Sequence, residues 1–135
     1  MITAVDTSII LDILTANPAH IKSSKSLFTK CQLQGRLVAC PIVWSELRPF
    51  FNKNTEMETI MEKLGVDFDS LDRVSALLAG TAWQDYRTRG GPKERIISDF
   101  LIGAHATVRA SRLLTRDRGF YRNYFKKLVI MEEGV

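Results

Sequence analysis

The sequence predicts an α/β protein in which a short-stranded, mainly parallel sheet lies between layers of helices. Three observations predict this fold class. Short apolar runs recur at residues 2–5, 37–40, 66–68, 113–115 and 128–131. Segments with the apolar periodicity of helices separate most of these runs, and Gly or Pro residues mark many of the boundaries. Alternating strands and helices favour right-handed βαβ crossovers, and hence parallel strands with helices on both faces.

The rest of the chain is organised around the first fifteen residues. An apolar run ends at Asp6, and a helical pattern begins at Ile9. We expect a strand, a very short turn and a helix, with Thr7 or Ser8 as the helix cap. Ligands of open α/β sheets bind beyond the carboxyl ends of the strands, so Asp6 is expected in that crevice. The alternative is that Asp6 is only a helix cap.

Prolines and glycines divide the next part of the chain. Pro18 ends the first helix and opens a second one, which Gly35 closes. Pro41 follows the strand at 37–40 and can occupy the first position of a third helix. We expect Pro49 to kink or shorten that helix, because proline removes a backbone donor.

Two further helices are expected before residue 90. Thr55 and Glu58 form a capping-box pattern ahead of a helix that stops at Gly65. After the strand at 66–68, Asp69 or Ser70 is expected to cap a longer helix. The apolar stripe predicted to face inward on that helix consists of Leu71, Val74, Leu77, Leu78 and Thr81.

The last third begins with a basic loop over residues 87–95. A helix at about 98–110 contains Gly103 and several alanines, and such small side chains let a helix lie close to a sheet. The predicted fold is completed by the strand at 113–115, a turn, a short aromatic helix or turn at 120–124 and the strand at 128–131.

Length and composition indicate one globular domain, residues 1–135, with a packed core. Of its 135 residues, 45% are hydrophobic and 25% are charged, as in typical soluble domains. No apolar run approaches the roughly 20 residues that cross a bilayer, and a strand at residue 2 leaves no room for a cleaved signal peptide. We therefore expect no membrane association.

Cysteine use and charge give weaker information. Cys31 and Cys40 are too few for a disulfide framework and lack metal-ligand spacing, so we expect reduced thiols and a cytoplasmic location. The formal net charge of +4 is compatible with a polyanionic partner but is common among ordinary proteins.

Four acidic residues fall near the same end of the predicted sheet. Asp6 ends the first strand, and Glu46 lies one turn into the helix after the second. Asp99 is at the start of the helix with small residues, and Asp117 follows the strand at 113–115. Most other acids lie on polar helix faces or in the C-terminal tail, where we expect them to be solvated.

Carboxylates gathered in one crevice repel one another, by roughly 4 kcal/mol for a pair about 4 Å apart at an effective dielectric constant of 20. Either some are protonated or a cation compensates them. An all-oxygen ligand set suits Mg²⁺ or Mn²⁺, whereas Zn²⁺ prefers His or Cys. An ion held by few carboxylates keeps water ligands, and one such water can attack phosphorus. The alternative is that these acids are caps and surface residues that do not meet.

Four segments support a more specific interpretation: Val5-Asp-Thr-Ser-Ile-Ile10, Val43-Trp-Ser-Glu46, Ile97-Ser-Asp-Phe-Leu-Ile-Gly-Ala-His-Ala106 and Leu113-Leu-Thr-Arg-Asp-Arg-Gly-Phe-Tyr121. In this order and at these separations the chain resembles a PIN-domain protein, specifically a VapC-type toxin of a toxin–antitoxin pair. The ordered set is specific, whereas no single motif is. The resemblance covers essentially the whole chain. It implies an α/β/α sandwich, a homodimer and a Mg²⁺-dependent endoribonuclease that a cognate antitoxin holds inactive.

The resemblance also implies roles for individual residues. The acidic positions of the family are matched by Asp6, Glu46, Asp99 and Asp117. Polar positions that orient the acids or metal-bound water are matched by Thr7, Ser8 and Thr115. Some relatives carry one more acid shortly after the fourth. Arg118 and Gly119 stand there in this chain, which leaves open whether a second metal is held.

We therefore predict an endoribonuclease in which Asp6 and Asp99 chiefly hold Mg²⁺, directly or through water, and Asp117 completes the cluster. Mn²⁺ is expected to substitute. Glu46 is expected to hold or polarise the attacking water. In-line attack leaves a 5′-phosphate and a 3′-hydroxyl, and the sequence does not identify the RNA.

Two functions of other classes remain open. One is a catalytically weak RNA-binding or dimerisation module that works mainly with a DNA-binding antitoxin, and it predicts RNA binding that survives chelation. The other is a phospho-receiver-like domain, which requires paired acids after the first strand and a lysine after a late strand. Lys126 and Lys127 fall too late for that role.

Two segments are candidate contact surfaces. The candidates for RNA contact in the basic loop are Arg87, Arg89, Lys93 and Arg95, and the alternative is a merely solvated loop. The apolar residues between Trp44 and Phe51 could receive a helical antitoxin segment, or could belong to the core.

Two more polar residues have plain structural explanations. Asp12 could face the crevice from the first helix, but a solvated helix position is the favoured interpretation. His105 lies among small apolar residues, so we expect a packed or half-buried histidine and not a general base.

Overall fold

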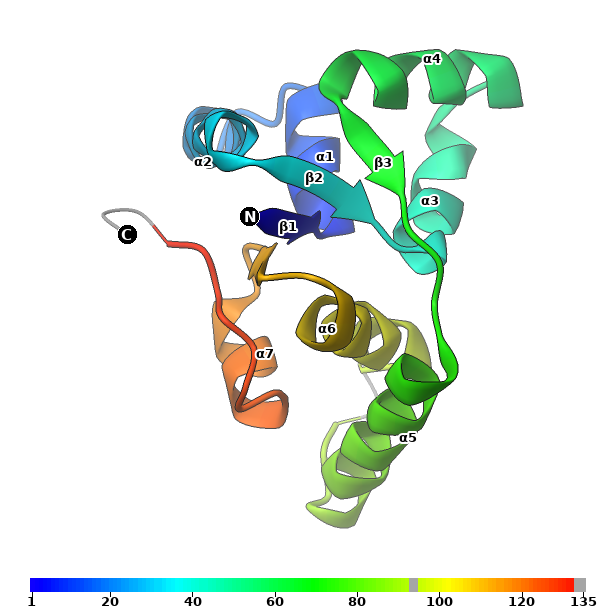
Figure 1. Ribbon diagram of the computed structural model, residues 1–135, viewed down its shortest axis with the longest axis vertical. Helices are drawn as coiled ribbons and strands as arrows, with labels where there is room; N and C mark the ends of the chain where they lie inside the picture. Colours follow the sequence, from blue (N-terminus) through cyan, green and yellow to red (C-terminus); the bar gives the residue numbers. More distant parts are fainter. Residues whose placement is uncertain (93–94, 133–135) are drawn as a thin grey trace.

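A parallel sheet with strand order β3-β2-β1-β4 forms the centre of the computed structural model, which describes residues 1–92 and 95–132 (Figure 1). Its strands are β1 (Ile2–Val5), β2 (Arg36–Ala39), β3 (Val66–Phe68) and β4 (Arg112–Leu114). Each neighbouring pair is parallel. The predicted α/β/α sandwich with a short-stranded parallel sheet is confirmed. The strand expected at 128–131 is reduced to one parallel bridge between Leu113 and Ile130.

Helices occupy most of the remaining chain. They are α1 (Thr7–Leu14), α2 (Ile21–Gln34), α3 (Pro41–Leu47), α4 (Asn54–Leu64), α5 (Arg73–Thr88), α6 (Ile97–Arg109) and α7 (Arg118–Tyr124). In Figure 1, α1 to α4 lie with β2 and β3 in the upper half, and α5 to α7 lie in the lower half. No helix within the described residues is both long and apolar enough to span a membrane.

The strand order creates a topological switch point between β1 and β4. The chain winds from β1 to β2 and β3 on one side, and then returns to place β4 on the other side of β1. At such a point the connections leave the sheet in opposite directions, which opens a crevice at the carboxyl ends of the two strands. Asp6 follows β1 directly, and Asp117 follows β4 after two residues.

The strands read as continuous apolar runs because the sheet is covered on both faces. Val5, Val38 and Leu113 are each at most 1% exposed, and neighbouring residues of the same strands are buried as well. A strand buried on both faces shows no alternation of polar and apolar residues.

Helix α6 requires small residues, as predicted, and Gly103 shows why. A Cβ atom at Gly103 would overlap the ring of Phe125, which follows α7. Ala104 and Ala106 are fully buried, and α6 contacts β4 as well as α5. This close packing fixes the helix that carries Asp99.

The predicted inner stripe of α5 was only partly right: Leu71 and Leu78 pack against the core, but Val74 and Leu77 do not. Val74 and Leu77 are 61% and 67% exposed, whereas Ser75, Ala79 and Ala82 are buried. Because α5 packs along α6, small residues of α5 such as Ala79 lie at the contact, and Tyr86 is the large side chain that α5 buries.

Several predicted helix ends also differ. Asp72, and not Asp69 or Ser70, caps α5, since its Oδ1 accepts from the N–H of Ser75 at 2.7 Å. Helix α4 has Lys53 at its N-cap and no side-chain cap hydrogen bond, so the expected capping box is not formed. Gly65 ends α4 in the left-handed conformation (φ 72°), as predicted.

The prolines also behave only partly as predicted. Helix α3 begins at Pro41 and ends at Leu47, and a 3₁₀ turn, Arg48–Phe50, contains Pro49. The expected shortening at Pro49 is therefore confirmed. Helix α2 begins at Ile21, three residues later than the predicted start at Pro18.

Candidate active site

A cavity of about 690 Å³ is lined by the four acids singled out in the sequence. Asp6 enters it from the end of β1, Glu46 from α3 and Asp99 from the first turn of α6. Asp117 enters it from the N-cap position of α7. Four separate elements thus deliver carboxylates to the crevice at the switch point of the sheet.

Asp6 is both the N-cap of α1 and a member of this acidic group. Its Oδ1 accepts from the backbone N–H of Thr7 at 2.8 Å, and its Oδ2 accepts from the hydroxyl of Thr115 at 2.7 Å. The prediction that Thr7 or Ser8 caps the helix was wrong, because the acid itself occupies the cap position. The two hydrogen bonds fix the orientation of its carboxylate.

Thr7 and Thr115 connect the acids to one another. The Thr7 hydroxyl donates to Oε1 of Glu46 at 2.7 Å. The Thr115 hydroxyl, which donates to Asp6, accepts from the backbone N–H of Asp117 at 3.0 Å. Both threonines therefore orient groups of the site. Ser8 also lines the cavity, and its buried hydroxyl has no hydrogen-bond partner within the described residues.

Asp99 and Asp117 have partners outside the acidic group. Oδ2 of Asp99 accepts from the backbone N–H of Ile96 at 3.2 Å, which ties the carboxylate to the start of its own helix. Asp117 forms an ion pair with Arg95. The guanidinium of Arg95 also lies 4.2 Å from the ring centroid of Phe120.

The site is strongly negative. Burial raises the pKa of Asp6 to about 6, although the hydrogen bonds from Thr115 and Thr7 oppose this shift. The charges of Glu46 and Asp99 raise it further. Burial also raises the pKa of Tyr121, a lining residue, well above its usual value, and the neighbouring acids add to that shift.

The donor set of the cavity fits a hard divalent cation in its chemistry. The candidate ligands are carboxylate oxygens, which suit Mg²⁺ and Mn²⁺. The pKa of Asp6 is about 6 because the carboxyl group is buried and lies near other negative charges. A bound cation would favour the ionised form of this group. Neither histidine and neither cysteine belongs to the cavity lining, so the set does not fit Zn²⁺.

The acids are not drawn together around one point. Among residues 1–92 and 95–132, no three His, Cys, Asp or Glu side chains are close enough to hold a metal ion. The partners just described explain this spacing, since each carboxylate is turned toward a backbone amide, a threonine or an arginine. In Asp117, the ion pair with Arg95 engages Oδ2.

The predicted RNA-contact residues lie at different distances from the cavity. Arg95 reaches Asp117, as described. Arg87 lies over the ring of Trp83 at 5.2 Å, and Arg89 pairs with Asp85 at 3.1 Å. Arg87 and Arg89 do not belong to the cavity lining. Lys93 lies outside the residues that the structure describes.

The interpretation of Asp12 as a solvated residue was wrong. It is 1% exposed, and its carboxylate pairs with Arg116 through Nε at 2.8 Å and Nη2 at 3.2 Å. The pattern of α1 alone could not show this, because Arg116 is 104 residues away in the sequence. The position of Arg116 between Thr115 and Asp117 was the available indication.

His105 is a packed histidine, as predicted. Its ring is 1% exposed, and Nε2 lies 2.7 Å from Oδ2 of Asp69. It does not line the cavity.

The apolar segment from Trp44 to Phe51 divides between core and surface. Phe50 is 57% exposed and lines the cavity, whereas Phe51 packs against the core. Trp44 is partly buried, and its ring meets the exposed Phe68 edge-on at 5.6 Å.

Solved structures share this fold at low sequence identity. VapBC-1 of nontypeable Haemophilus influenzae has a TM-score of 0.72 at 22% identity, covering 98% of each chain. VapBC2 of Rickettsia felis, bound to a DNA fragment from the promoter, has a TM-score of 0.67 at 17% identity, covering 97% of this chain and 98% of that one. FitAcB of Neisseria gonorrhoeae has a TM-score of 0.65 at 20% identity, covering 98% and 97%.

No curated protein sequence matches the chain significantly. The family model of the PIN domain, in contrast, matches residues 3–126 and therefore includes all four elements that carry the acids. The chain belongs to the PIN-domain family.

Proposed function

We propose that this chain is a VapC-type toxin, a Mg²⁺-dependent endoribonuclease that acts in the cytoplasm and is neutralised by a cognate antitoxin. One observation carries the proposal: four separate elements deliver Asp6, Glu46, Asp99 and Asp117 to a single cavity at the switch point of the sheet. The fold shared with VapBC and FitAB structures supports the toxin assignment.

The chain's own residues divide the chemical tasks. Asp6 and Asp99 would chiefly hold Mg²⁺, or Mn²⁺ in its place, and Asp117 would complete the cluster. When bound, the ion supplies charge stabilisation at the scissile phosphate and a more acidic water. Thr115 keeps the Asp6 carboxylate in one orientation through the 2.7 Å hydrogen bond.

Glu46 is suited to accept the proton of the attacking water. Thr7 donates to its Oε1 at 2.7 Å, and the side chain is exposed to solvent. Neither histidine lines the cavity, and the mechanism uses none.

RNA binding is expected to involve the basic segment at the end of α5 and the loop after it. Arg87 and Arg89 are exposed, and Arg95 reaches the edge of the cavity. For each arginine or lysine that contacts a phosphate of single-stranded RNA, the RNA affinity is expected to fall by about 0.7 log unit per log unit of salt concentration. Lys93 belongs to the same proposed segment by its sequence position.

The antitoxin is expected to cover the cavity near Phe50. An aromatic side chain that is 57% exposed beside an acidic cavity can anchor an apolar residue of a helical segment, whose arginines then meet the acids. Phe50→Ser is expected to weaken antitoxin binding and leave the fold unchanged. Phe51, the other candidate, packs against the core, so its substitution would disturb the fold together with antitoxin binding.

A homodimer is expected to use the outer face of α5. Val74 and Leu77 are 61% and 67% exposed there in the described part of the chain, and exposed apolar patches often mark interfaces. Light scattering should give a dimer for the wild-type chain and a monomer for Leu77→Asp.

One observation favours a second candidate function. The ion pair between Arg95 and Asp117 keeps one carboxylate engaged, as expected for a catalytically weak RNA-binding module that acts with its antitoxin. Such a module would bind RNA equally well with and without EDTA and would not cleave it.

The deciding experiment measures cleavage of total RNA by the purified chain. We expect cleavage with Mg²⁺ or Mn²⁺, loss of cleavage with EDTA, and recovery when either ion is added back in excess. Zn²⁺ should not be required, since the cavity lacks His and Cys ligands. Cleavage that is unaffected by EDTA would overturn the proposal.

A further inference from the structure

We propose that Arg116 binds a phosphate of the RNA backbone in the acidic cavity, and that Asp12 holds its guanidinium ready for this contact. The inference rests on the proposed function, and deepens it by naming a residue that receives the substrate.

Arg116 supplies the positive charge of the cavity wall. Among the described residues that line the cavity, it is the basic one, whereas five are acidic: Asp6, Asp12, Glu46, Asp99 and Asp117. A phosphodiester entering this cavity is repelled by the acids and needs cationic partners. Arg95 does not line the cavity, and its guanidinium is engaged by Asp117.

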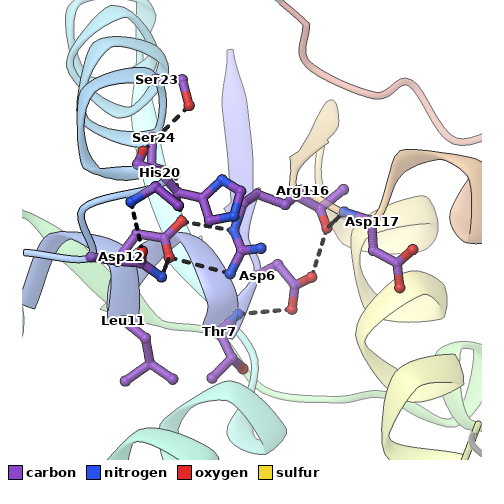
Figure 2. Close-up of polar contacts among 12 residues, drawn as sticks. Asp6, Thr7, Leu11, Asp12, His20, Ser23, Ser24, Arg116 and Asp117 are labelled. Atoms are coloured by element: carbon purple, nitrogen blue, oxygen red, sulfur yellow. Dashed lines mark hydrogen bonds and ion pairs between the residues drawn. The ribbon is translucent and has the colours of Figure 1, made fainter. Parts of the chain in front are cut away.

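Asp12 fixes one edge of the Arg116 guanidinium. The two hydrogen bonds between them, at 2.8 and 3.2 Å, use Nε and Nη2. Asp12 is itself held by the hydroxyl of Ser24 at 2.6 Å and by the amide of Asn17 at 3.3 Å. Figure 2 shows the Arg116 side chain reaching across toward Asp12 on α1, with Asp6 beside it.

The other edge of the guanidinium is open. The Arg116 side chain is 37% exposed, whereas that of Asp12 is 2% exposed. A guanidinium has five N–H donors, and the donors of Nη1 have no partner within the described residues. Phosphate oxygens suit this free fork. Because Asp12 already orders the side chain, binding costs less conformational entropy.

The simpler explanation is that Arg116 only neutralises the buried Asp12. That explanation accounts for the ion pair but not for its position. Arg116 stands between Thr115, which orients Asp6, and Asp117, whose backbone N–H is held by Thr115. The backbone segment that orders two acids of the site therefore also presents the cation, so a bound phosphate lies in the same cavity as the acids.

The test compares two variants that both lack the Asp12 charge. Removing Arg116 alone would leave a buried carboxylate unpaired and destabilise the fold. Asp12→Asn retains Arg116, and Asp12→Asn with Arg116→Gln replaces the pair by neutral hydrogen-bonding groups of similar size. Melting curves establish that both variants are folded. Binding of a fluorescent single-stranded RNA is then titrated at several KCl concentrations with constant Ca²⁺, and gels check that the RNA stays intact.

The inference predicts a difference between the two variants. The double variant should bind RNA about tenfold more weakly at low salt, with a salt slope shallower by about 0.7 than that of Asp12→Asn. If the two variants have equal RNA affinity and equal salt dependence, the role of Arg116 is purely structural and the inference is wrong. If the wild-type chain neither binds nor cleaves RNA, the proposed function falls and this inference with it. Wild-type binding and cleavage with indistinguishable variants overturn the inference alone.

Discussion

At the scale of single residues, the two roles of Asp99 predict opposite effects of Asp99→Asn on RNA cleavage. As a helix cap, it accepts from the N–H of Ile96, and the amide oxygen of asparagine can accept the same bond. As a metal ligand, asparagine is much poorer than a carboxylate. We predict that Asp99→Asn abolishes RNA cleavage and leaves the protein folded.

Without metal, Asp99→Asn should melt at the wild-type temperature or above it, since one negative charge leaves a crowded cavity. Mg²⁺ should raise its melting temperature less than that of the wild type. Glu62→Gln, a charge loss on the exposed side of α4, is the matched control and should keep full activity. Full activity in Asp99→Asn would remove Asp99 from the site.

The sequence indicated the acidic residues better than the contacts around them. Asp6 directly follows an apolar run and Asp117 follows Leu114 after two intervening residues, so local patterns placed both near strand ends. The pair of Asp12 and Arg116 joins residues 104 positions apart, and each looks like an ordinary surface residue within its own segment. The parallel pairing of β1 with β4 places α1 and the residues after β4 at the same end of the sheet, and this brings the pair together.

At the scale of elements, the position of α6 depends on Gly103. We predict that Gly103→Ala lowers the free energy of unfolding by about 1–3 kcal/mol, because its Cβ overlaps the Phe125 ring and overpacking strains a core. Cleavage should also fall, since a displaced α6 moves Asp99. Chemical denaturation and the RNA-cleavage assay measure the two effects.

Gly80→Ala is the matched control on α5. A Cβ there has no neighbour within 4 Å, so the variant should gain about 0.5–1 kcal/mol of stability from helix propensity and keep its activity. If Gly103→Ala is as stable and active as this control, α6 is not held by the contact with Phe125.

An ionic cluster ties the start of α5 to α6 and should make stability depend on pH. His105 contacts Asp69 at 2.7 Å, and Arg109 contacts both Asp69 and Asp72 at 2.7 and 3.2 Å. Burial lowers the pKa of His105 below its ordinary 6.5, although Asp69 opposes the shift. The hydrogen bond from Arg109 is the main cause that lowers the pKa of Asp69.

The direction of the pH dependence of stability follows from the number of protons that the folded and unfolded chains bind. As the pH falls below 6.5, the unfolded chain protonates His105 before the folded chain does, so stability falls with pH in this window. The contribution of Asp69 is lost only at more acidic pH, below its ordinary 3.8. We predict that urea denaturation between about pH 7 and 5 shows a steeper loss for wild type than for His105→Gln. His20→Gln, at the start of α2, serves as control, and identical slopes for wild type and His105→Gln would contradict the prediction.

The sequence indicated most elements but not how each helix faces the core. Gly65 and Pro41 marked real boundaries because their backbone chemistry acts locally. The stripe of α5 failed at Val74 and Leu77 because α5 and α6 approach through small residues such as Ala79, so the burial of Val74 could not be judged from its hydrophobicity alone. The strand expected at 128–131 was reduced to one bridge for a related reason, since pairing depends on neighbours that the segment does not itself specify.

At the scale of the whole molecule, the fold class was predictable and the strand order was not. Short buried strands between helices indicate a parallel sheet, but they do not reveal that the chain returns across β1 to place β4. That return creates the switch point, and the switch point creates the cavity in which Asp6 and Asp117 face the same space. The site is therefore a property of topology that the order of motifs could only suggest.

The most direct test of the account is the chemistry of the RNA ends that the wild-type chain produces. Attack by an activated water on phosphorus breaks the P–O3′ bond, so that O3′ leaves as a 3′-hydroxyl and the phosphate stays on the 5′ oxygen of the next nucleotide. We predict these ends, in reactions that contain Mg²⁺ and stop with EDTA, when the cleaved RNA is ligated and sequenced. Products that end in a 2′,3′-cyclic phosphate and a 5′-hydroxyl would contradict the account, since they require attack by the RNA's own 2′-hydroxyl.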